Sequence, residues 1–279
     1  MEQITNVLSV DVEEYFQVEA LSGSVDRRTW DSYTMRVDGS LARILDLFDR
    51  HEARATFFIL GWVAGKHPEL VREIAGRGHE IGCHGFGHQR LHCLTPAQFR
   101  TDLREALGAL TDEAQQPVRC YRAPSFSIVR DTMWALDLLS EEGFTCDSSI
   151  FPVHHDFYGV PDAPRFPYWH KTPQGNSIFE FPPSTVRLFG NNVGVGGGGY
   201  LRLFPYAVTS WAIKRINRTE GQPAMVYFHP WEIDPGQPRV AVPLRSRVRH
   251  YTNLDTMEQK IHRLLHDFKF TTLSDYVGC

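Results

Sequence analysis

Short apolar runs alternate with amphipathic helical stretches along most of this 279-residue chain. The apolar runs predict strands at 7–12, 54–60, 79–83, 118–121, 144–147, 178–181, 225–229 and 270–273. Helices are expected over about 38–50, 95–113, 131–142, 205–217 and 253–267. Because repeated strand-then-helix units form parallel sheets with right-handed crossovers, the pattern predicts an α/β fold. The expected form is a distorted (β/α) barrel with seven or eight parallel strands.

The composition suits one domain and excludes some partners. Hydrophobic residues make up 42% of the chain, enough for one barrel-sized core, so we expect a single domain over 1–279. The net charge is −4 without a basic stripe, which argues against a nucleic-acid partner. No leader-like segment or membrane-length apolar run occurs, so no membrane span is expected. Five scattered cysteines without a CxxC pair favour reduced thiols and predict a cytoplasmic protein, working there or at the inner membrane face.

Acidic residues end the first predicted strand. The apolar run through Val10 stops at Asp11, Glu13 and Glu14. Carboxylates at the end of a buried strand are costly to desolvate unless they serve a metal, a proton or a substrate. Since side chains alternate along a strand, Asp11 and Glu13 point the same way and Val12 points the other way. In a parallel barrel, chemistry is found at this end of the strands.

Two histidines follow the third predicted strand as His84-x-x-x-His88. The spacing alone carries little weight, because the chain has 13 histidines and the same spacing recurs elsewhere. Gly85 and Gly87 set this pair apart, since glycines allow a turn that aims both imidazoles at one point. The neighbouring Cys83 should alternate to the other face and be a buried thiol.

Three further strand ends carry Arg122, Asp147 and His229. An arginine beside a carboxylate can hold it ionised and oriented, and a surface arginine is the alternative. Asp147, followed by two serines, can orient a histidine, hold substrate hydroxyls or simply form a turn. His229 can act as a general acid, with a satisfied core histidine as the alternative.

Two long segments, 13–37 and 148–177, interrupt the strand–helix alternation. Both are rich in aromatic residues, which can stack on sugar rings or cap the mouth of the barrel. The glycine-rich run 194–199 lacks the Lys-Ser/Thr ending of a phosphate-binding loop. A flexible loop is therefore the favoured interpretation of that run.

These motifs, in this order, resemble the polysaccharide deacetylase (NodB homology) family, carbohydrate esterase family four. That family has a strand-end aspartate pair, His-x-x-x-His, Arg-x-Pro, an aspartate-bearing segment and a late strand ending in histidine. The corresponding positions are Asp11 with Glu13, His84 with His88, Arg122-Ala123-Pro124, Asp147, and Phe228-His229. The flanking residues look most like the exosortase and exopolysaccharide-cluster subgroup, with a subgroup-specific extension over residues 180–279.

Two positions depart from the family's pattern. Val12 stands where the family has its second aspartate, so we expect Glu13 to replace that metal ligand, with Glu14 as the second choice. Gly85 stands where the family often has Ser or Thr, which removes a supporting hydroxyl from the histidine loop.

The resemblance implies a metal-dependent hydrolase that removes N-acetyl groups from sugars of a polysaccharide or its lipid-linked precursor. Glu13, His84 and His88 would hold the divalent metal, zinc or else cobalt, manganese or nickel. The other implied roles are Asp11 as base, Arg122 orienting it, His229 as acid, Asp147 positioning that acid, and Ser125, Tyr15 and Trp231 contacting substrate.

Three other functions stay open. Related barrels hydrolyse small cyclic ureides or imides and can work without a metal. Deacetylation of a sugar ester would use the same residues as deacetylation of an amide. A sugar-binding or scaffold protein is disfavoured, because a binder has no need for the full set of acids, histidines and arginine.

Overall fold

A curled, mostly parallel sheet organises the chain, and the computed structural model describes residues 4–155, 158–172 and 174–278. Cys279 and three residues of the predicted 148–177 loop therefore lie outside the described residues. The sheet strands are β1 (Thr5–Val12), β2 (Thr56–Ile59), β3 (Glu80–Cys83), β4 (Cys120–Tyr121), β5 (Cys146–Asp147), β6 (Tyr168–Lys171), β7 (Ser177–Glu180), β10 (Met225–Phe228) and β11 (Lys269–Thr271). They are ordered β10-β1-β2-β3-β4-β5-β7-β6, with β11 also pairing with β1.

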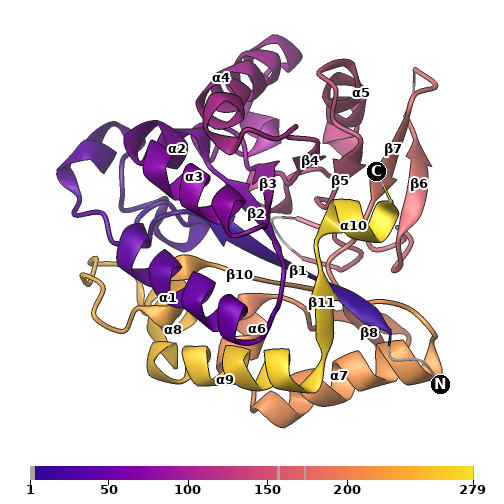
Figure 1. Cartoon of the computed structure of the whole chain (residues 1–279). Coiled ribbons are helices and arrows are strands. Elements are labelled where there is room, and N and C mark those ends of the chain that lie inside the picture. Colours follow the sequence, from indigo (N-terminus) through magenta and orange to yellow (C-terminus); the bar gives the residue numbers. More distant parts are fainter. Residues whose placement is uncertain (1–3, 156–157, 173, 279) are drawn as a thin grey trace.

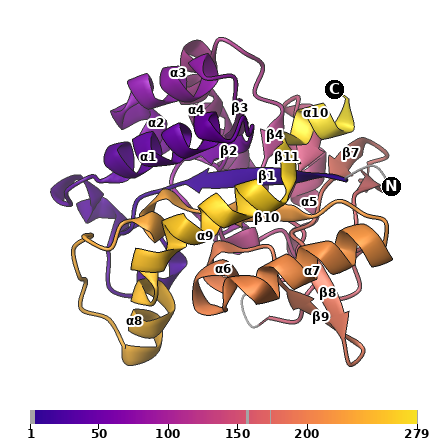
Figure 2. The same ribbon diagram turned by 60° about the horizontal axis from the view of Figure 1, so that its bottom comes forward.

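Helices surround this sheet (Figure 1). They are α1 (Val37–Arg50), α2 (Gly61–Lys66), α3 (Pro68–Gly76), α4 (Pro96–Ala114), α5 (Trp134–Glu141), α6 (Gly198–Leu203), α7 (Tyr206–Thr219), α8 (Leu244–Tyr251), α9 (Leu254–Asp267) and α10 (Leu273–Val277). Figures 1 and 2 both place α2 to α4 on one side of β1, and α6, α7 and α9 on the other. The predicted distorted barrel is confirmed. Among the residues described, none of the helices combines the length and apolar character needed to cross a bilayer.

Strand alternation sorts the buried side chains into two cores. One core joins strand residues to the helices and includes Val10 and Val12. A smaller core takes residues from the strands and α10, including Val7, Cys120 and Cys146, and therefore fills the barrel interior. Because neighbours on a strand face opposite ways, Asp11 lies on the interior side of β1.

The segment 182–197 completes the barrel beyond β10. The backbone N–H of Ser184 donates to the Met225 carbonyl, and the Gly196 carbonyl accepts from the backbone N–H of Tyr227. A Cβ on Gly198, the first residue of α6, would lie 1.8 Å from Oε2 of Glu232. The run 194–199 is therefore closely packed, and the predicted flexible loop is wrong because these glycines let backbone approach β10 and Glu232.

Other departures from the predicted elements are local. β6 lies inside the predicted 148–177 loop and pairs antiparallel with β7, and β8 (Thr185–Leu188) and β9 (Asn191–Gly194) form an unpredicted hairpin. Asp131 lies in a short 3₁₀ turn, and α5 begins at Trp134. In the 13–37 segment, the aromatic rings pack on one another in a buried cluster, so they cap the barrel mouth.

Candidate functional site

The ends of β1 and β3 bring together the three predicted metal ligands. One potential ligand atom from each of Glu13, His84 and His88 lies within 4.8 Å of the others. All three side chains are buried. Two imidazoles and a carboxylate suit several divalent metals.

The protonation states also suit a cation. Burial alone would raise the pKa of Glu13, but the charge of His88, with smaller effects from His229 and His84, lowers it to about 2. Burial lowers the pKa of His84 to about 4. The His84 Nδ1 lies 2.7 Å from the Arg122 carbonyl oxygen, so its Nε2 is left for a ligand. The buried Oε2 of Glu13 lies 2.9 Å from Nε2 of His88, so a metal ion bound between the two would take the place of a proton there.

The loop between the histidines is held by Asp102 of α4. Its carboxylate accepts hydrogen bonds from the backbone N–H groups of Phe86 (2.9 Å) and Gly87 (3.3 Å). Gly85 has a φ of +74°, and a Cβ there would lie 2.8 Å from Oδ2 of Asp102. Asp102 thus supports the loop that lacks the family's hydroxyl, while Cys83 packs into the helix-facing core as predicted.

Asp11 and Arg122 form a buried pair beside these ligands. The Nη1 of Arg122 donates to Oδ1 of Asp11 at 2.6 Å and to Oγ of Ser9 at 2.7 Å. The remaining nitrogens of Arg122 donate to the carbonyl and Oγ of Ser148. Arg122 is fully buried, which excludes the surface-arginine alternative. With Oδ1 occupied, Oδ2 of Asp11 faces His229 at 3.9 Å from Nε2.

Ser125 lies in an unusual backbone conformation after Pro124. Its φ is +55° and the next residue, Phe126, has a φ of +52°. Two consecutive non-glycine residues in the left-handed region are costly and are typical of functional sites. Within the described part of the chain, no acceptor is found for the Ser125 backbone N–H. This group is therefore free to donate to a ligand.

His229 follows β10 and is oriented by Glu232. Oε2 of Glu232 lies 3.1 Å from Nδ1 of His229 and accepts from its backbone N–H at 3.0 Å. The opposite nitrogen, Nε2, lies 3.6 Å from Oε1 of Glu13. Burial lowers the pKa of His229, but the hydrogen bond to Glu232 and the carboxylates of Glu13 and Asp11 outweigh that effect and raise it to about 9.

Trp231 contacts both Glu13 and His229. Its Nε1 donates to Oε1 of Glu13 at 3.2 Å, and its ring stacks between the rings of His229 and His250. Only 8% of Trp231 is exposed. Its indole N–H therefore bonds to a candidate metal ligand. The predicted contact of Trp231 with substrate stays a prediction.

Three predicted site residues lie elsewhere. Glu14 accepts from the backbone N–H groups of Arg36 and Val37 at the start of α1, so it caps a helix and is not the alternative ligand. Tyr15 is buried in the aromatic cluster, which contradicts its predicted contact with substrate.

Asp147 does not match its predicted positioning role. Its neighbour Cys146 faces the barrel interior, so Asp147 faces the other way and pairs in register with Glu180. Its carboxylate accepts from Oγ and the backbone N–H of Ser149, and Glu232 orients His229 instead.

The sequence reasoning missed Asp102, Glu232 and Arg202, all of which support the site. Glu232 carried a usable signal: it stands three residues after His229, with Pro230 at the first helical position, which is the spacing of a capping box. Asp102 and Arg202 lie on helices and carried no comparable signal.

The chain matches two protein families. Residues 28–144 match the polysaccharide deacetylase family, and residues 148–278 match a family described as a domain of unknown function, DUF3473. His84, His88 and Arg122 lie in the first match and His229 in the second, while Asp11 and Glu13 precede both.

Curated relatives match part of the chain. A peptidoglycan-N-acetylglucosamine deacetylase of Bacillus cereus is 28% identical over 118 residues, 38% of this chain and 43% of its own length. A chitooligosaccharide deacetylase of Rhizobium leguminosarum is 30% identical over 116 residues, 40% of this chain and 48% of its own length. The chain thus spans less than half the length of these relatives.

A solved structure shares the whole fold. A putative polysaccharide deacetylase from Mycobacterium smegmatis superposes with a TM-score of 0.64 at 20% identity, covering 100% of this chain and 94% of that one. At this identity the likeness shows the fold alone.

Proposed function

We propose that this chain is a metal-dependent hydrolase that removes N-acetyl groups from N-acetylated sugars, because residues 28–144 match the polysaccharide deacetylase family. The observation that carries this proposal is the arrangement of one buried acid–arginine pair, one Glu-His-His cluster and one accessible histidine around a single point. The side chain of His229 is 19% exposed, against 3% for Asp11 and Glu13. Substrate would therefore approach from the His229 side.

Glu13, His84 and His88 would hold the divalent cation, zinc or else cobalt, manganese or nickel. When bound, such a cation lowers the pKa of water and polarises an acyl oxygen. The ionised Glu13 and neutral His84 need lose no proton to become ligands. Trp231 and Asp102 hold the ligands in place through Glu13 and the histidine loop.

Asp11 would act as the general base. Arg122 occupies Oδ1 and keeps the carboxylate ionised in its buried setting. Oδ2 would take a proton from the water that attacks the amide carbon. The backbone N–H of Ser125 would donate to the oxygen on which negative charge develops, and its strained backbone holds that donor in place.

His229 would act as the general acid. Glu232 accepts at Nδ1, so Nε2 faces Asp11 and Glu13 and can give its proton to the leaving amine. The products would be acetate and the free amino sugar. A polysaccharide or lipid-linked precursor in exopolysaccharide synthesis is the substrate that the sequence resemblance favours, and this finer assignment stays a prediction.

The test is acetate release by the purified chain, chelated and then reloaded with metal. The panel contains N-acetylhexosamine oligomers, an O-acetylated xylan and a small cyclic imide. We expect metal-dependent release from the N-acetylated oligomers. Release from the O-acetylated polymer alone would indicate an esterase, and turnover of the imide alone would indicate the cyclic-amide reaction; either result would overturn the proposal.

A further inference from the structure

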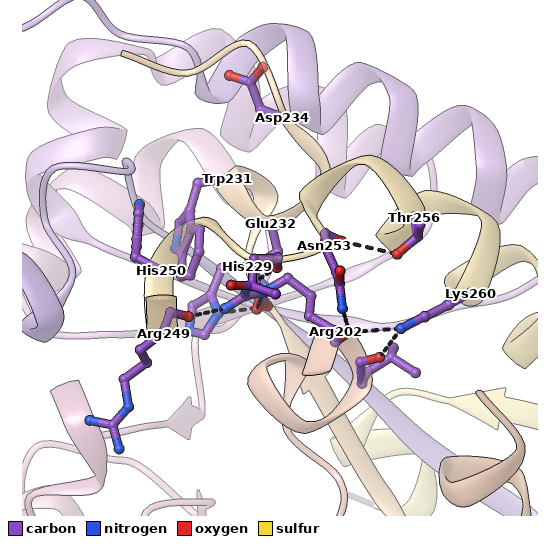
Figure 3. Close-up of polar contacts among 12 residues, drawn as sticks. Arg202, His229, Trp231, Glu232, Asp234, Arg249, His250, Asn253, Thr256 and Lys260 are labelled. Carbon is purple, nitrogen blue, oxygen red and sulfur yellow. Dashed lines mark hydrogen bonds and ion pairs between the residues drawn. The ribbon is translucent and has the colours of Figure 1, made fainter. Parts of the chain in front are cut away.

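A buried ion pair stands directly behind His229 (Figure 3). Glu232 is fully buried, and its Oε1 accepts from Nε of Arg202 at 2.6 Å while its Oε2 faces His229. Arg202, 2% exposed, comes from α6, 30 residues earlier in the chain. The carboxylate therefore links the histidine to α6.

Arg202 is fixed at all of its nitrogens. Its Nη1 donates to the carbonyl of Thr252 at 2.8 Å and its Nη2 to the carbonyl of Arg249 at 2.9 Å, both at the end of α8. The guanidinium also lies 5.3 Å from the centre of the Trp231 ring. An arginine held in this way cannot turn to another acceptor, so Glu232 is locked in turn.

The backbone of Arg202 is anchored as well. Nδ2 of Asn253 and Nζ of Lys260 both donate to its carbonyl oxygen, at 3.0 and 2.8 Å. Figure 3 shows these donors on the α9 side of the arginine, opposite His229. Hydrogen bonds therefore connect α9 to the imidazole of His229 without a break, through Arg202 and Glu232.

A structural role alone does not account for this arrangement. A buried ion pair contributes little net stability compared with apolar side chains of similar size. Only one oxygen of Glu232 is used by Arg202, and the other meets both the ring and the backbone of His229. Gly198 leaves the space that this carboxylate fills.

We infer that Glu232 and Arg202 are positioning residues for His229, which keep its Nδ1 protonated and its Nε2 aimed at the reacting atoms; their kinetic effect rests on the proposed function. The carboxylate is an acceptor only, so it selects the ring form with a proton on Nδ1. Arg202 keeps the carboxylate charged and in place. Neither residue touches substrate.

Glu232→Gln tests this directly. The amide oxygen should go to the charged Arg202, which turns the amide NH₂ toward His229 and makes Nδ1 an acceptor. We expect kcat for acetate release to fall about 10- to 100-fold, as for other residues that orient a site group, with KM and bound metal unchanged. Glu258→Gln is the matched control: Glu258 is a half-exposed residue of α9 that pairs with Arg43 of α1, and its substitution should change none of these values.

Two measurements distinguish a positioning role for Glu232 from a purely structural one. In a His229→Ala background, Glu232→Gln should lower kcat by less than about a further twofold, because its effect on catalysis passes through the imidazole. A loss as large as in the wild-type background would overturn the inference.

The second readout needs no activity. The ¹⁵N chemical shifts of His229, assigned by their absence in His229→Ala, should show a protonated Nδ1 in the wild-type protein and an unprotonated one in Glu232→Gln. An unprotonated Nδ1 in the wild-type protein would overturn the inference even if the variant did not fold. If the wild-type protein released no acetate from any substrate, the proposed function would fail, and these shifts alone would decide the positioning role.

Discussion

The two sides of the site are built in different ways. The metal side consists of Glu13, His84 and His88, which follow β1 and β3, and its histidine loop is held by Asp102, 15 and 16 residues from the amides it binds. The acid side consists of His229, Trp231, Glu232 and Arg202, and it depends on α6 and on the end of α8. The histidine loop of the metal side is therefore held by a residue within 16 positions of it, whereas the carboxylate behind His229 is held by an arginine 30 positions away.

The two sides also differ in how well their charges are matched. On the acid side, Glu232 has Arg202 and His229 as partners, and the charge of Arg202 is the main effect that outweighs burial and lowers the pKa of the carboxyl to about 2. On the metal side, the buried Oε2 of Glu13 has no hydrogen-bond partner among the described residues and faces only the imidazole of His88. The acid side is complete in the protein alone, while the metal side has an oxygen that a cation would satisfy.

The largest expected effect comes from His84→Ala on the metal side. Loss of one of three ligands should abolish metal binding, and with it several kcal/mol of transition-state stabilisation, or roughly a 1000-fold loss of acetate release. Bound metal per chain and initial rates check this. His92→Ala, an exposed histidine four residues after His88, is the control; full metal content in His84→Ala would contradict the assignment.

Next is His229→Ala on the acid side. We expect normal metal content but a kcat lower by about 100-fold, the low end of what a general acid contributes. Metal analysis and kinetics on the same preparation measure the metal content and kcat, respectively. If this variant lost its metal, the separation between the two sides would be wrong. The exposed His266→Ala should match the wild-type protein.

Trp231→Phe should give a smaller effect, in which a change on the acid side weakens metal binding on the metal side. The ring stack is kept, but Glu13 loses the hydrogen bond from Nε1. Metal affinity should weaken by about tenfold, at the low end for a residue supporting a ligand, while kcat at saturating metal stays within a few-fold. Metal titration measures the first and kinetics the second. Trp211→Phe, on the exposed face of α7, is the control and should leave affinity unchanged.

The smallest effect is expected at His79, which belongs to neither side of the site. Its ring is buried against Phe48 and Phe57. Burial lowers its pKa to about 4, so only the unfolded chain takes up its proton as pH falls below 6.5. The folded state should lose up to roughly 3 kcal/mol from this group between pH 6.5 and 4.

His79→Leu should remove that part of the pH dependence without changing acetate release at pH 7. Urea unfolding at pH 7 and 4.5 measures it, with His266→Leu as the matched control. An unchanged pH dependence would show that the acid sensitivity arises elsewhere, including at the site.

Strand-end chemistry was predictable where strands are long and regular. Alternation along the eight residues of β1 places Asp11 inward, and Arg122 meets it as expected. The same rule applied to β5 would have turned Asp147 away from His229, because Cys146 occupies the interior. β6 was missed because its residues, Tyr-Trp-His-Lys, are half exposed at a sheet edge and lack an apolar run.

The supports of the site were harder to predict for a physical reason. Glu232 could have been found from its capping-box spacing to His229. Arg202 could not, because its role is set by the packing of α6 against α8 and α9, which no local pattern encodes. Tyr15 was misplaced because an aromatic ring beside a site is equally compatible with a buried cluster.

The missing side chain of Gly198 has a consequence for comparing sequences. A Cβ there would lie within bonding distance of the Glu232 carboxylate, so no larger residue fits while Glu232 keeps this position. Positions 198 and 232 should therefore co-vary across homologous chains, with glycine at the first wherever glutamate holds the second. That pairing would identify, from sequence alone, chains whose acid histidine is supported in this way.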